Sequence, residues 1–456
     1  MHTPRWSTAL ICAALLSASS SNAAQLEVPV EYYRLPNGLR VVLSRDTAVP
    51  TTTVAMYYHI GFRIEPRART GFAHLFEHLM FQETQNLAKG EADRLVSGNG
   101  GVSNGSTRFD FTNYFEVVPS HALEPVLWVE AERMRGLALS PASLQNQKDV
   151  VKNEVRVNVL NRPYGGVPWL DLPQDANSNW YNAHNFYGEF ADIDAATLAD
   201  VRDFYDTYYV PANAVLVVAG DFEPDLTRAA IARYFGPLPA RPEPSRPDVA
   251  EPGQIGVRIA RKQDPLAPRP AIAWSYHAPP RNTPAWYAFA LIDQILLQGE
   301  DSRLWQRLVR DRGYSDSVEG GLNLLGNMFD YEGPSGWAVY LIHDPAASEL
   351  KITNDFDAVV DGLKTKLVSR AELQRSLTKI RSALYDVAGS ATRFGLVDLL
   401  ASFALFDDDP ARINRIESQL RLVTPELIRR TAQTYLVTSN RTELQLGAGK
   451  APGGAP

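Results

Sequence analysis

The sequence predicts an α+β protein built from two homologous domains. Three observations support this. A proline-rich stretch divides the 456-residue chain near its middle, the strands that open each half recur at one fixed spacing, and the helix and strand that close each half recur at another. We expect domains over residues 24–236 and 255–449, joined by a linker over residues 237–254.

The proline-rich stretch reads GPLPARPEPSRPDVAEPGQ from Gly236 to Gln254. Six of its residues are proline, and its apolar residues follow neither the helix nor the strand period. Proline favours extended backbone and ends regular elements, so this stretch is predicted to be a semi-extended linker.

The two halves repeat the same order of elements. Three residues of the opening strands have an identical residue 218 positions later: Gly38 and Gly256, Tyr58 and Tyr276, His59 and His277. Two residues of the closing helix and strand recur 227 positions later: Tyr208 and Tyr435, Asn213 and Asn440. Agreement of element order at both ends indicates a duplicated unit with strands first, helices between, and a closing helix and strand.

The N-terminus has the features of a secretory signal peptide over residues 1–23. Arg5 precedes a short apolar run, and small residues end at Ala23. We expect export, to a bacterial periplasm; the alternative is an uncleaved, buried N-terminal helix. No apolar stretch is long enough to predict an integral membrane segment. Residues 450–456 are predicted to form a disordered tail.

Composition narrows the possible functions. The net charge is −7 and no lysine or arginine block occurs, which argues against nucleic acid as a partner. The only cysteine, Cys12, lies in the predicted signal peptide. A mature chain would have no disulfides, and any metal site would use His, Asp or Glu.

The most informative motif for the chemistry of the chain is His74-Leu75-Phe76-Glu77-His78. Apolar residues around it recur at helical spacing, and Thr70 is the expected N-cap. His74 and His78 are one turn apart, so their imidazoles share a helix face and can hold one Zn²⁺ beside the Glu77 carboxylate. The inverted H-x-x-E-H order is typical of zinc peptidases. The alternative is two histidines with no metal.

A catalytic zinc site usually has three protein ligands. Glu154 is a candidate because it shares a helix face with Val150 and Val151. We expect this face to be buried, where a carboxylate needs a compensating partner. Spacing alone does not select it, because Glu130 and Glu132 also precede a helical run.

With these residues, the chain resembles the inverted zinc metallopeptidases of the pitrilysin, insulin-degrading enzyme and mitochondrial processing peptidase group. It is most similar to their short bacterial two-domain members. The resemblance extends from Asn37-Gly38-Leu39 to Asn440. It implies one Zn²⁺ per chain, peptide substrates, and two halves that enclose a clamshell-like chamber. It also implies that Glu154, which lies 76 residues after His78, is the third ligand.

Two further positions are interpreted through this resemblance. Many members carry an acidic residue where this chain has Gln147, which can form hydrogen bonds around the ligands but supplies no charge; alternatively, Gln147 is a surface residue. The weak strand at residues 100–114 is expected at a sheet edge, where Asn104 and Gly105 would hold substrate backbone. Asn104 matches the family, Gly105 replaces its usual alanine, and the alternative is a hairpin that binds nothing.

The second half lacks the chemistry of the first. Its residues at the 218 offset are Ile292, Ile295 and Leu296, so no second zinc site is expected. Active members usually supply an Arg and a Tyr from this half, yet residues 336–343 contain no arginine. The nearby arginines, expected to form a solvated face, are Arg303, Arg307 and Arg310. We therefore expect a homologous partner subunit that supplies the pair, in a heterodimer; a homodimer is the alternative.

The sequence thus predicts an exported zinc endopeptidase that acts on unfolded peptides or small protein fragments. Glu77 would be its catalytic base, and its zinc ligands would be His74, His78 and Glu154. One alternative is a non-catalytic binding or assembly subunit of the same fold. Another is a periplasmic ligand-binding protein that uses the cleft between the domains.

Overall fold

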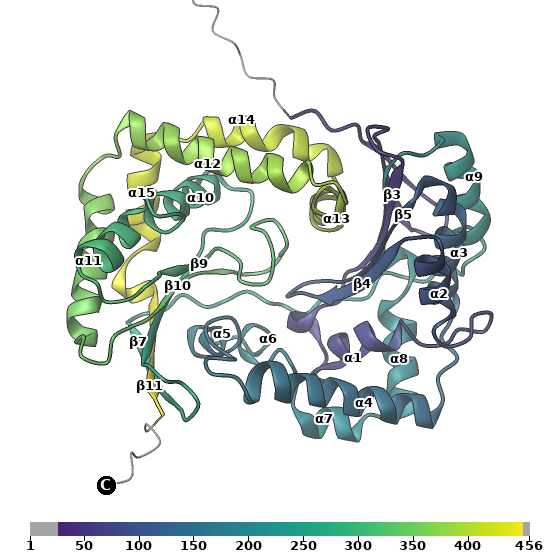
Figure 1. The fold of residues 1–456 in the computed structure, drawn as a ribbon, viewed down its shortest axis with the longest axis horizontal. Coiled ribbons are helices and arrows are strands. Elements are labelled where there is room, and N and C mark those ends of the chain that lie inside the picture. The colour runs from purple at the N-terminus through teal and green to yellow at the C-terminus, as the bar shows by residue number, and fades with distance from the viewer. Residues whose placement is uncertain (1–25, 450–456) are drawn as a thin grey trace, which may run out of the picture.

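The structure, a computed structural model, describes residues 26–449. The predicted signal peptide and the predicted tail over residues 450–456 lie outside the described residues. Each half of the chain forms one sheet covered by helices, and the halves face each other (Figure 1). The predicted α+β class is confirmed.

The first half forms a six-stranded sheet in the order β1-β2-β6-β3-β5-β4. Its strands are β1 Glu31–Arg34, β2 Arg40–Arg45, β3 Thr51–Tyr58, β4 Val102–Thr107, β5 Thr112–Pro119 and β6 Ala214–Gly220. Only β2 and β6 pair in parallel. The polar strand β4 lies at the edge, as the sequence predicted.

The second half repeats this sheet with five strands in the order β7-β11-β8-β10-β9. They are β7 Arg258–Asp264, β8 Ala271–His277, β9 Glu319–Gly321, β10 Gly336–Ile342 and β11 Arg441–Ala448. The parallel pair β7 and β11 corresponds to β2 and β6, and the edge strand β9 corresponds to β4. Equal strand order and equal placement of the parallel pair support the duplication.

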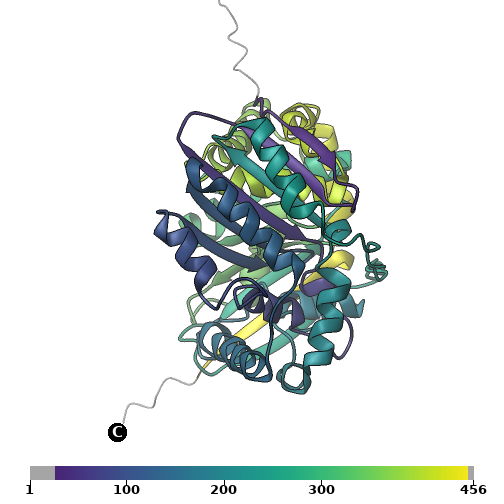
Figure 2. The ribbon, with the colours of Figure 1, turned by 90° about the vertical axis from the view of Figure 1, so that its right-hand side faces the viewer.

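Helices cover both sheets. Those of the first half are α1 Phe72–Leu79, α2 Glu91–Gly98, α3 Leu123–Arg135, α4 Pro141–Val155, α5 Asp171–Ala176, α6 Trp180–Ala183, α7 Phe190–Ala195, α8 Leu198–Tyr208 and α9 Pro224–Phe235. Those of the second are α10 Pro284–Leu296, α11 Glu349–Thr365, α12 Arg370–Ala388, α13 Phe394–Asp407, α14 Ile416–Arg421 and α15 Pro425–Tyr435. Figure 2 shows helices of the first half across the outer face of its sheet.

Each half places one helix on the sheet of the other. Helix α13 packs on β6 of the first sheet, and α5 packs on β11 of the second (Figure 1). The exchange buries both faces of each central strand, which explains why every residue of β6 is buried. At the first contact, the hydroxyl of Tyr57 donates to Asp398 at 2.8 Å. One hydrophobic core therefore spans both halves.

Between α9 and β7 the chain forms no helix or strand. This segment is held in place, because Asn179 donates to the carbonyl of Asp248 and Asn182 to that of Val249, each at 2.9 Å. Within residues 26–449, no helix combines the length and the apolar character that crossing a bilayer requires.

Candidate active site

Helix α1 carries the two motif histidines, and its start differs from the prediction. The N-cap is Gly71, at φ +82°, and not Thr70, whose hydroxyl donates to Asp192 at 2.6 Å. The buried Glu65 carboxylate caps the helix by accepting the amides of Gly71 at 2.8 Å and Ala73 at 2.6 Å. A carboxylate at a helix N-terminus satisfies free N–H groups and complements the helix dipole, so a residue before the helix performs the cap.

The structure brings His74, His78 and Glu154 together. The two Nε2 atoms lie 3.4 Å apart. Glu154, near the end of α4, places Oε1 3.5 Å from His74 Nε2 and Oε2 3.2 Å from His78 Nε2. His74 is buried, whereas the side chains of His78 and Glu154 are 20% and 33% exposed, so the cluster is reachable from solvent.

The geometry of these donors fits a zinc ion. Nitrogen and oxygen ligands bind zinc at about 2.0–2.2 Å, which places the ligand atoms of a tetrahedron about 3.3 Å apart. The observed separations are 3.2, 3.4 and 3.5 Å. Hydrogen bonds with His74 and His78 hold the pKa of Glu154 well below its usual range, so it is a carboxylate at neutral pH.

The other two glutamates considered as ligands are engaged elsewhere. Glu130 and Glu132 belong to α3, where they pair with Arg133 and Arg135 respectively. The valines next to Glu154 differ from each other, since Val151 is fully buried but Val150 is exposed. The expectation that both valines lie on a buried face is therefore wrong for Val150.

Glu77 lies beside the cluster and contacts the edge strand. Its Oε2 accepts a hydrogen bond from the hydroxyl of Thr107, at the end of β4, at 2.6 Å. A Cβ atom at Gly105 would lie 3.3 Å from Glu77 Cγ and 3.1 Å from Asn113 O. Glycine at this position therefore lets α1 and β4 approach closely. The neighbouring Asn104 is exposed, and its side chain accepts the Gly105 amide at 2.9 Å.

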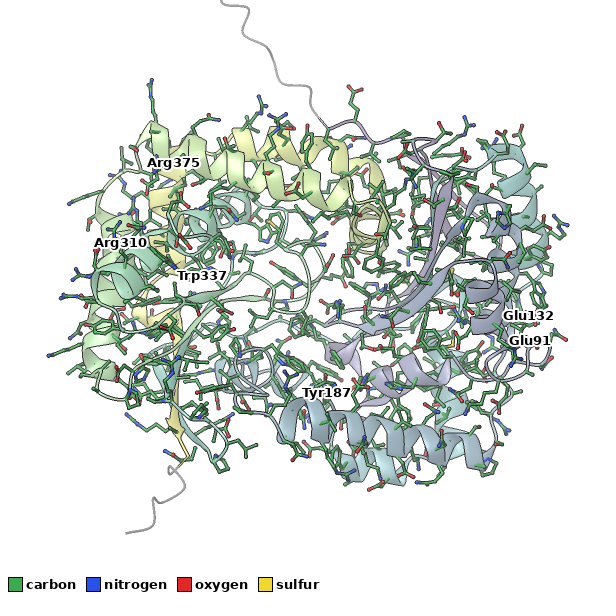
Figure 3. The ribbon with its side chains drawn as sticks, in the orientation of Figure 1. Glu91, Glu132, Tyr187, Arg310, Trp337 and Arg375 are labelled. Carbon is green, nitrogen blue, oxygen red and sulfur yellow. The ribbon has the colours of Figure 1, made fainter. Side chains whose placement is uncertain are left out.

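Aromatic residues form the wall behind His74. The rings of Tyr187 and Phe62 have centroids 5.2 and 6.4 Å from the imidazole. Tyr187 lies beside α4 on the inner side of the first half (Figure 3). Burial raises its pKa to about 12, so the phenol keeps its proton at neutral pH.

Gln147 is buried, and its Nε2 donates to Asn146 Oδ1 at 2.9 Å. No contact within the described residues supports its predicted role around the ligands. Sequence reasoning missed Thr107, Tyr187 and Glu65. Of these, only Glu65 could have been found from the sequence. It is an acidic residue shortly before a helix whose N-cap residue, Gly71, has no side chain to cap it.

In the second half, the counterparts of the site residues are apolar and buried: Ile292, Ile295 and Leu296. Tyr340, the tyrosine of residues 336–343, donates to Glu319 at 2.6 Å. The three arginines considered there pair with acidic residues of their own half: Arg303 with Glu372, Arg307 with Asp355, and Arg310 with Asp311.

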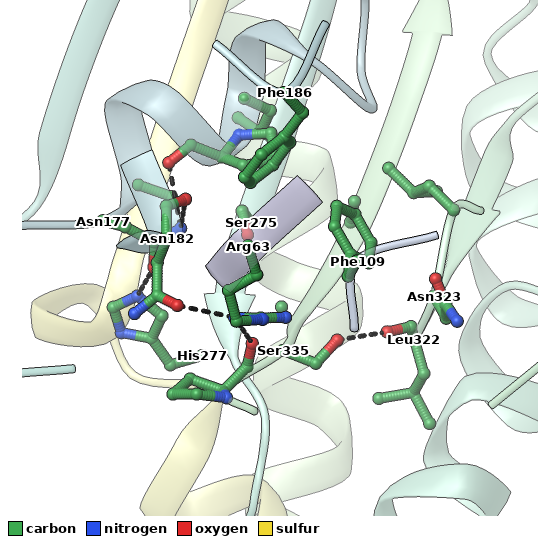
Figure 4. Close-up of a pocket in the computed structure, with 17 residues that line it drawn as sticks. Arg63, Phe109, Asn177, Asn182, Phe186, Ser275, His277, Leu322, Asn323 and Ser335 are labelled. Carbon is green, nitrogen blue, oxygen red and sulfur yellow. Dashed lines mark hydrogen bonds between the residues drawn. The ribbon is translucent and has the colours of Figure 1, made fainter. Parts of the chain in front are cut away.

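The halves meet at a cavity of about 50 Å³ (Figure 4). Arg63 crosses the boundary there, since it donates to Pro334 O at 2.8 Å and to Asn182 Oδ1 at 2.6 Å. It also pairs with Asp110 at 2.7 Å, and the other oxygen of Asp110 accepts the Glu332 amide at 2.8 Å. The buried Arg63–Asp110 pair of the first half thus holds the second half through hydrogen bonds to its backbone.

Two family models match the chain. One, described as insulinase (peptidase family M16), matches residues 40–163, and the other, described as the peptidase M16 inactive domain, matches residues 195–380. The chain belongs to peptidase family M16. The first model includes all three residues of the His-His-Glu cluster, and the second includes most of the half that lacks one.

Relatives and solved structures agree with M16 membership. Zinc protease PqqE of Helicobacter pylori is 27% identical over 438 residues, which cover 94% of this chain and 95% of that one. A mitochondrial-processing peptidase subunit beta of Blastocladiella emersonii is 26% identical over 50% of this chain and 48% of its own. A crystal structure of a protease from Helicobacter pylori superposes with a TM-score of 0.84 at 25% identity, covering 92% of this chain and 99% of that one.

Proposed function

We propose that this M16 chain is a zinc-dependent endopeptidase that hydrolyses unfolded peptides or small protein fragments. The observation that carries the proposal is the convergence of the His74, His78 and Glu154 donor atoms beside the Glu77 carboxylate. The similarity to a relative named as a zinc protease supports it.

Each side chain has a defined part in the proposed reaction. His74, His78 and Glu154 hold one zinc ion, which when bound supplies Lewis-acid activation of a water molecule and of the scissile carbonyl. Glu77 accepts the proton of the attacking water and delivers it to the leaving amine. Thr107 orients the Glu77 carboxylate through their hydrogen bond.

Strand β4 provides a place for the substrate backbone. As an edge strand, it has no neighbouring strand on its outer side, so an extended peptide can pair there. We propose that Asn104 and Gly105 hold the substrate there, next to Glu77. A requirement for extended backbone favours unfolded substrates over folded proteins.

Cleavage of a quenched, unstructured peptide library tests the function. Residues 24–456, loaded with zinc, should cleave the library, and a chelator should stop cleavage until zinc is restored. If zinc is bound and no peptide is cleaved by the chain, alone or with a partner subunit, the chain is a non-catalytic binding or assembly subunit instead.

Replacing Thr107 with valine should lower kcat by about 10- to 100-fold with little change in KM or zinc content, because loss of a hydrogen bond that orients a catalytic group has effects of that size. Peptide-cleavage kinetics provide the measurement. Ser106→Ala is the matched control, because Ser106 lies next to Thr107 on β4 and its hydroxyl donates to Asn113 of β5 instead. An unchanged kcat in Thr107→Val would show that the contact does not position Glu77.

We also propose that a homologous subunit completes the site in a heterodimer. In support, Tyr340 and the three arginines Arg303, Arg307 and Arg310 all make their contacts within the second half. Full-rate cleavage by a purified monomer would refute this; activity in a homodimer alone would assign the partner to a second copy.

Export to the periplasm remains a proposal from the sequence of residues 1–23. N-terminal sequencing of the protein from a periplasmic fraction should begin at Ala24. Recovery of the intact N-terminus from the cytoplasm would contradict it.

A further inference from the structure

The second half contains a cavity of about 230 Å³, which α10 lines with Ala290, Asp293 and Gln294. Its walls come from α10, α12 and the edge strand β9. These elements stand in the second half where α1, α4 and β4 stand in the first, and α10 packs on α12 as α1 packs on α4.

The walls of this cavity are mainly apolar. Its apolar lining residues include Met328, Phe329, Ile380, Leu384, Leu399 and Leu420. An engineered apolar cavity of about 150 Å³ stays dry and binds benzene. A cavity of about 230 Å³ therefore has room for a substituted benzene ring.

The polar part of the wall consists of one carboxylate and the side-chain amides of Gln294, Gln298, Asn323 and Asn327. Asp293, on α10, is only 7% exposed and lines the cavity. Its Oδ1 accepts hydrogen bonds from Trp337 Nε1 at 2.7 Å and Gln298 Nε2 at 3.2 Å. Its other oxygen, Oδ2, has no hydrogen-bond partner among residues 26–449. Trp337 and Tyr187 lie in opposite halves, so this carboxylate is separate from the candidate active site (Figure 3).

The charge of Asp293 also lacks a direct ion pair. Lys379 influences it through space, but the Lys379 ammonium donates to Asp301 at 2.8 Å and to the carbonyl of Gln294 at 3.1 Å. Burial raises the pKa of Asp293 to about 6, so most of the carboxyl is ionised above pH 7. A buried charge that has only neutral hydrogen-bond donors and no counter-charge is costly, and a cation that reaches Oδ2 reduces that cost.

We propose that the cavity binds a small apolar amine. The ammonium would donate to Asp293 Oδ2, and the apolar body would pack against residues such as Phe329 and Leu384. A neutral apolar molecule would leave Oδ2 unpaired, an anion would be repelled, and a cation without an apolar body would leave the remaining wall uncovered. The combination of one free carboxylate oxygen and apolar walls selects the amine.

Occupancy of the cavity should affect how the halves meet. Met328 and Phe329 line it, and the next few residues cross to the first half, where Asp110 accepts the amides of Glu332 at 2.8 Å and Gly333 at 3.3 Å. A ligand that packs on Phe329 therefore stabilises the segment that joins the halves.

Isothermal titration calorimetry on zinc-loaded protein of residues 24–456 tests the proposal with three probes of one shape. We expect saturable binding of 3-phenylpropan-1-amine, weaker binding of 3-phenylpropan-1-ol, and no binding of 3-phenylpropanoate. Asp293→Asn should weaken amine binding by at least about tenfold, because it removes a charge-assisted hydrogen bond, and should leave alcohol binding nearly unchanged.

A second variant locates the bound amine. Ala383 lies exposed at the rim of the cavity, so Ala383→Phe should keep the fold and block entry. Circular dichroism checks folding of both variants. Absence of amine binding to the wild type, or equal binding to the wild type and to a folded Ala383→Phe or Asp293→Asn variant, would overturn the proposal.

Discussion

Glu77→Gln should lower peptide-cleavage kcat by about 10²–10⁴-fold, the usual contribution of a general base. Glutamine has the same shape and can still accept the hydrogen bond from Thr107, but it cannot take a proton from water. Zinc content should stay that of the wild type, because the carboxylate of Glu77 is not one of the three converging donors.

Cleavage kinetics and metal content measured on one preparation distinguish the roles of Glu77. Glu189→Gln, an exposed carboxylate of the same half, is the matched control and should have wild-type activity. Retention of the wild-type rate by Glu77→Gln would remove Glu77 from the mechanism. Loss of zinc together with activity would mean that Glu77 contributes to holding the metal.

Arg133→Met should destabilise the first half by about 3–5 kcal/mol, the range found when one partner of a buried ion pair is removed. Arg133 is buried on α3 and donates to Glu116 Oε1 at 2.6 Å and also to Glu130. Both carboxylates are fully buried. Burial, together with the charge of Glu130, already raises the pKa of Glu116 well above its usual range. Removing the single cation leaves two acidic groups without a counter-charge.

Urea unfolding followed by circular dichroism measures this loss. Arg233→Met is the control, because Arg233 pairs with Glu124 on the surface and exposed pairs contribute about 0–1 kcal/mol. Adding Glu116→Leu and Glu130→Leu to Arg133→Met should recover stability, since apolar groups can replace a buried ionic cluster. Equal midpoints for Arg133→Met and Arg233→Met would contradict this account of the cluster.

Local periodicity was sufficient to predict the arrangement of the motif residues. Two residues four apart on a helix share a face, so His74 and His78 had to lie together if α1 formed. The repeated spacing likewise predicted the second sheet, because strands with the same order and the same turns form the same pairings.

Contacts between distant segments could not be predicted in this way. Glu130, Glu132 and Glu154 have similar local surroundings in the sequence, and only tertiary packing separates them: α4 contacts α1, whereas α3 packs on β3 and α9. The cap of α1 was assigned to Thr70 because caps are usually local, whereas Glu65 provides it from outside the helix. Similarly, the apolar sequence of α13 indicates burial, but not that the sheet of the other half buries it.

Zinc content per chain tests the central claim most directly. Protein of residues 24–456 is loaded with zinc, dialysed and analysed by inductively coupled plasma mass spectrometry, with His121→Ala, an exposed histidine, as the control. We predict one zinc per chain in the wild type and the control, and loss of zinc in a folded His74→Ala variant, which lacks one of the three donors. A folded wild type without zinc, or a His74→Ala variant that keeps it, would contradict the account.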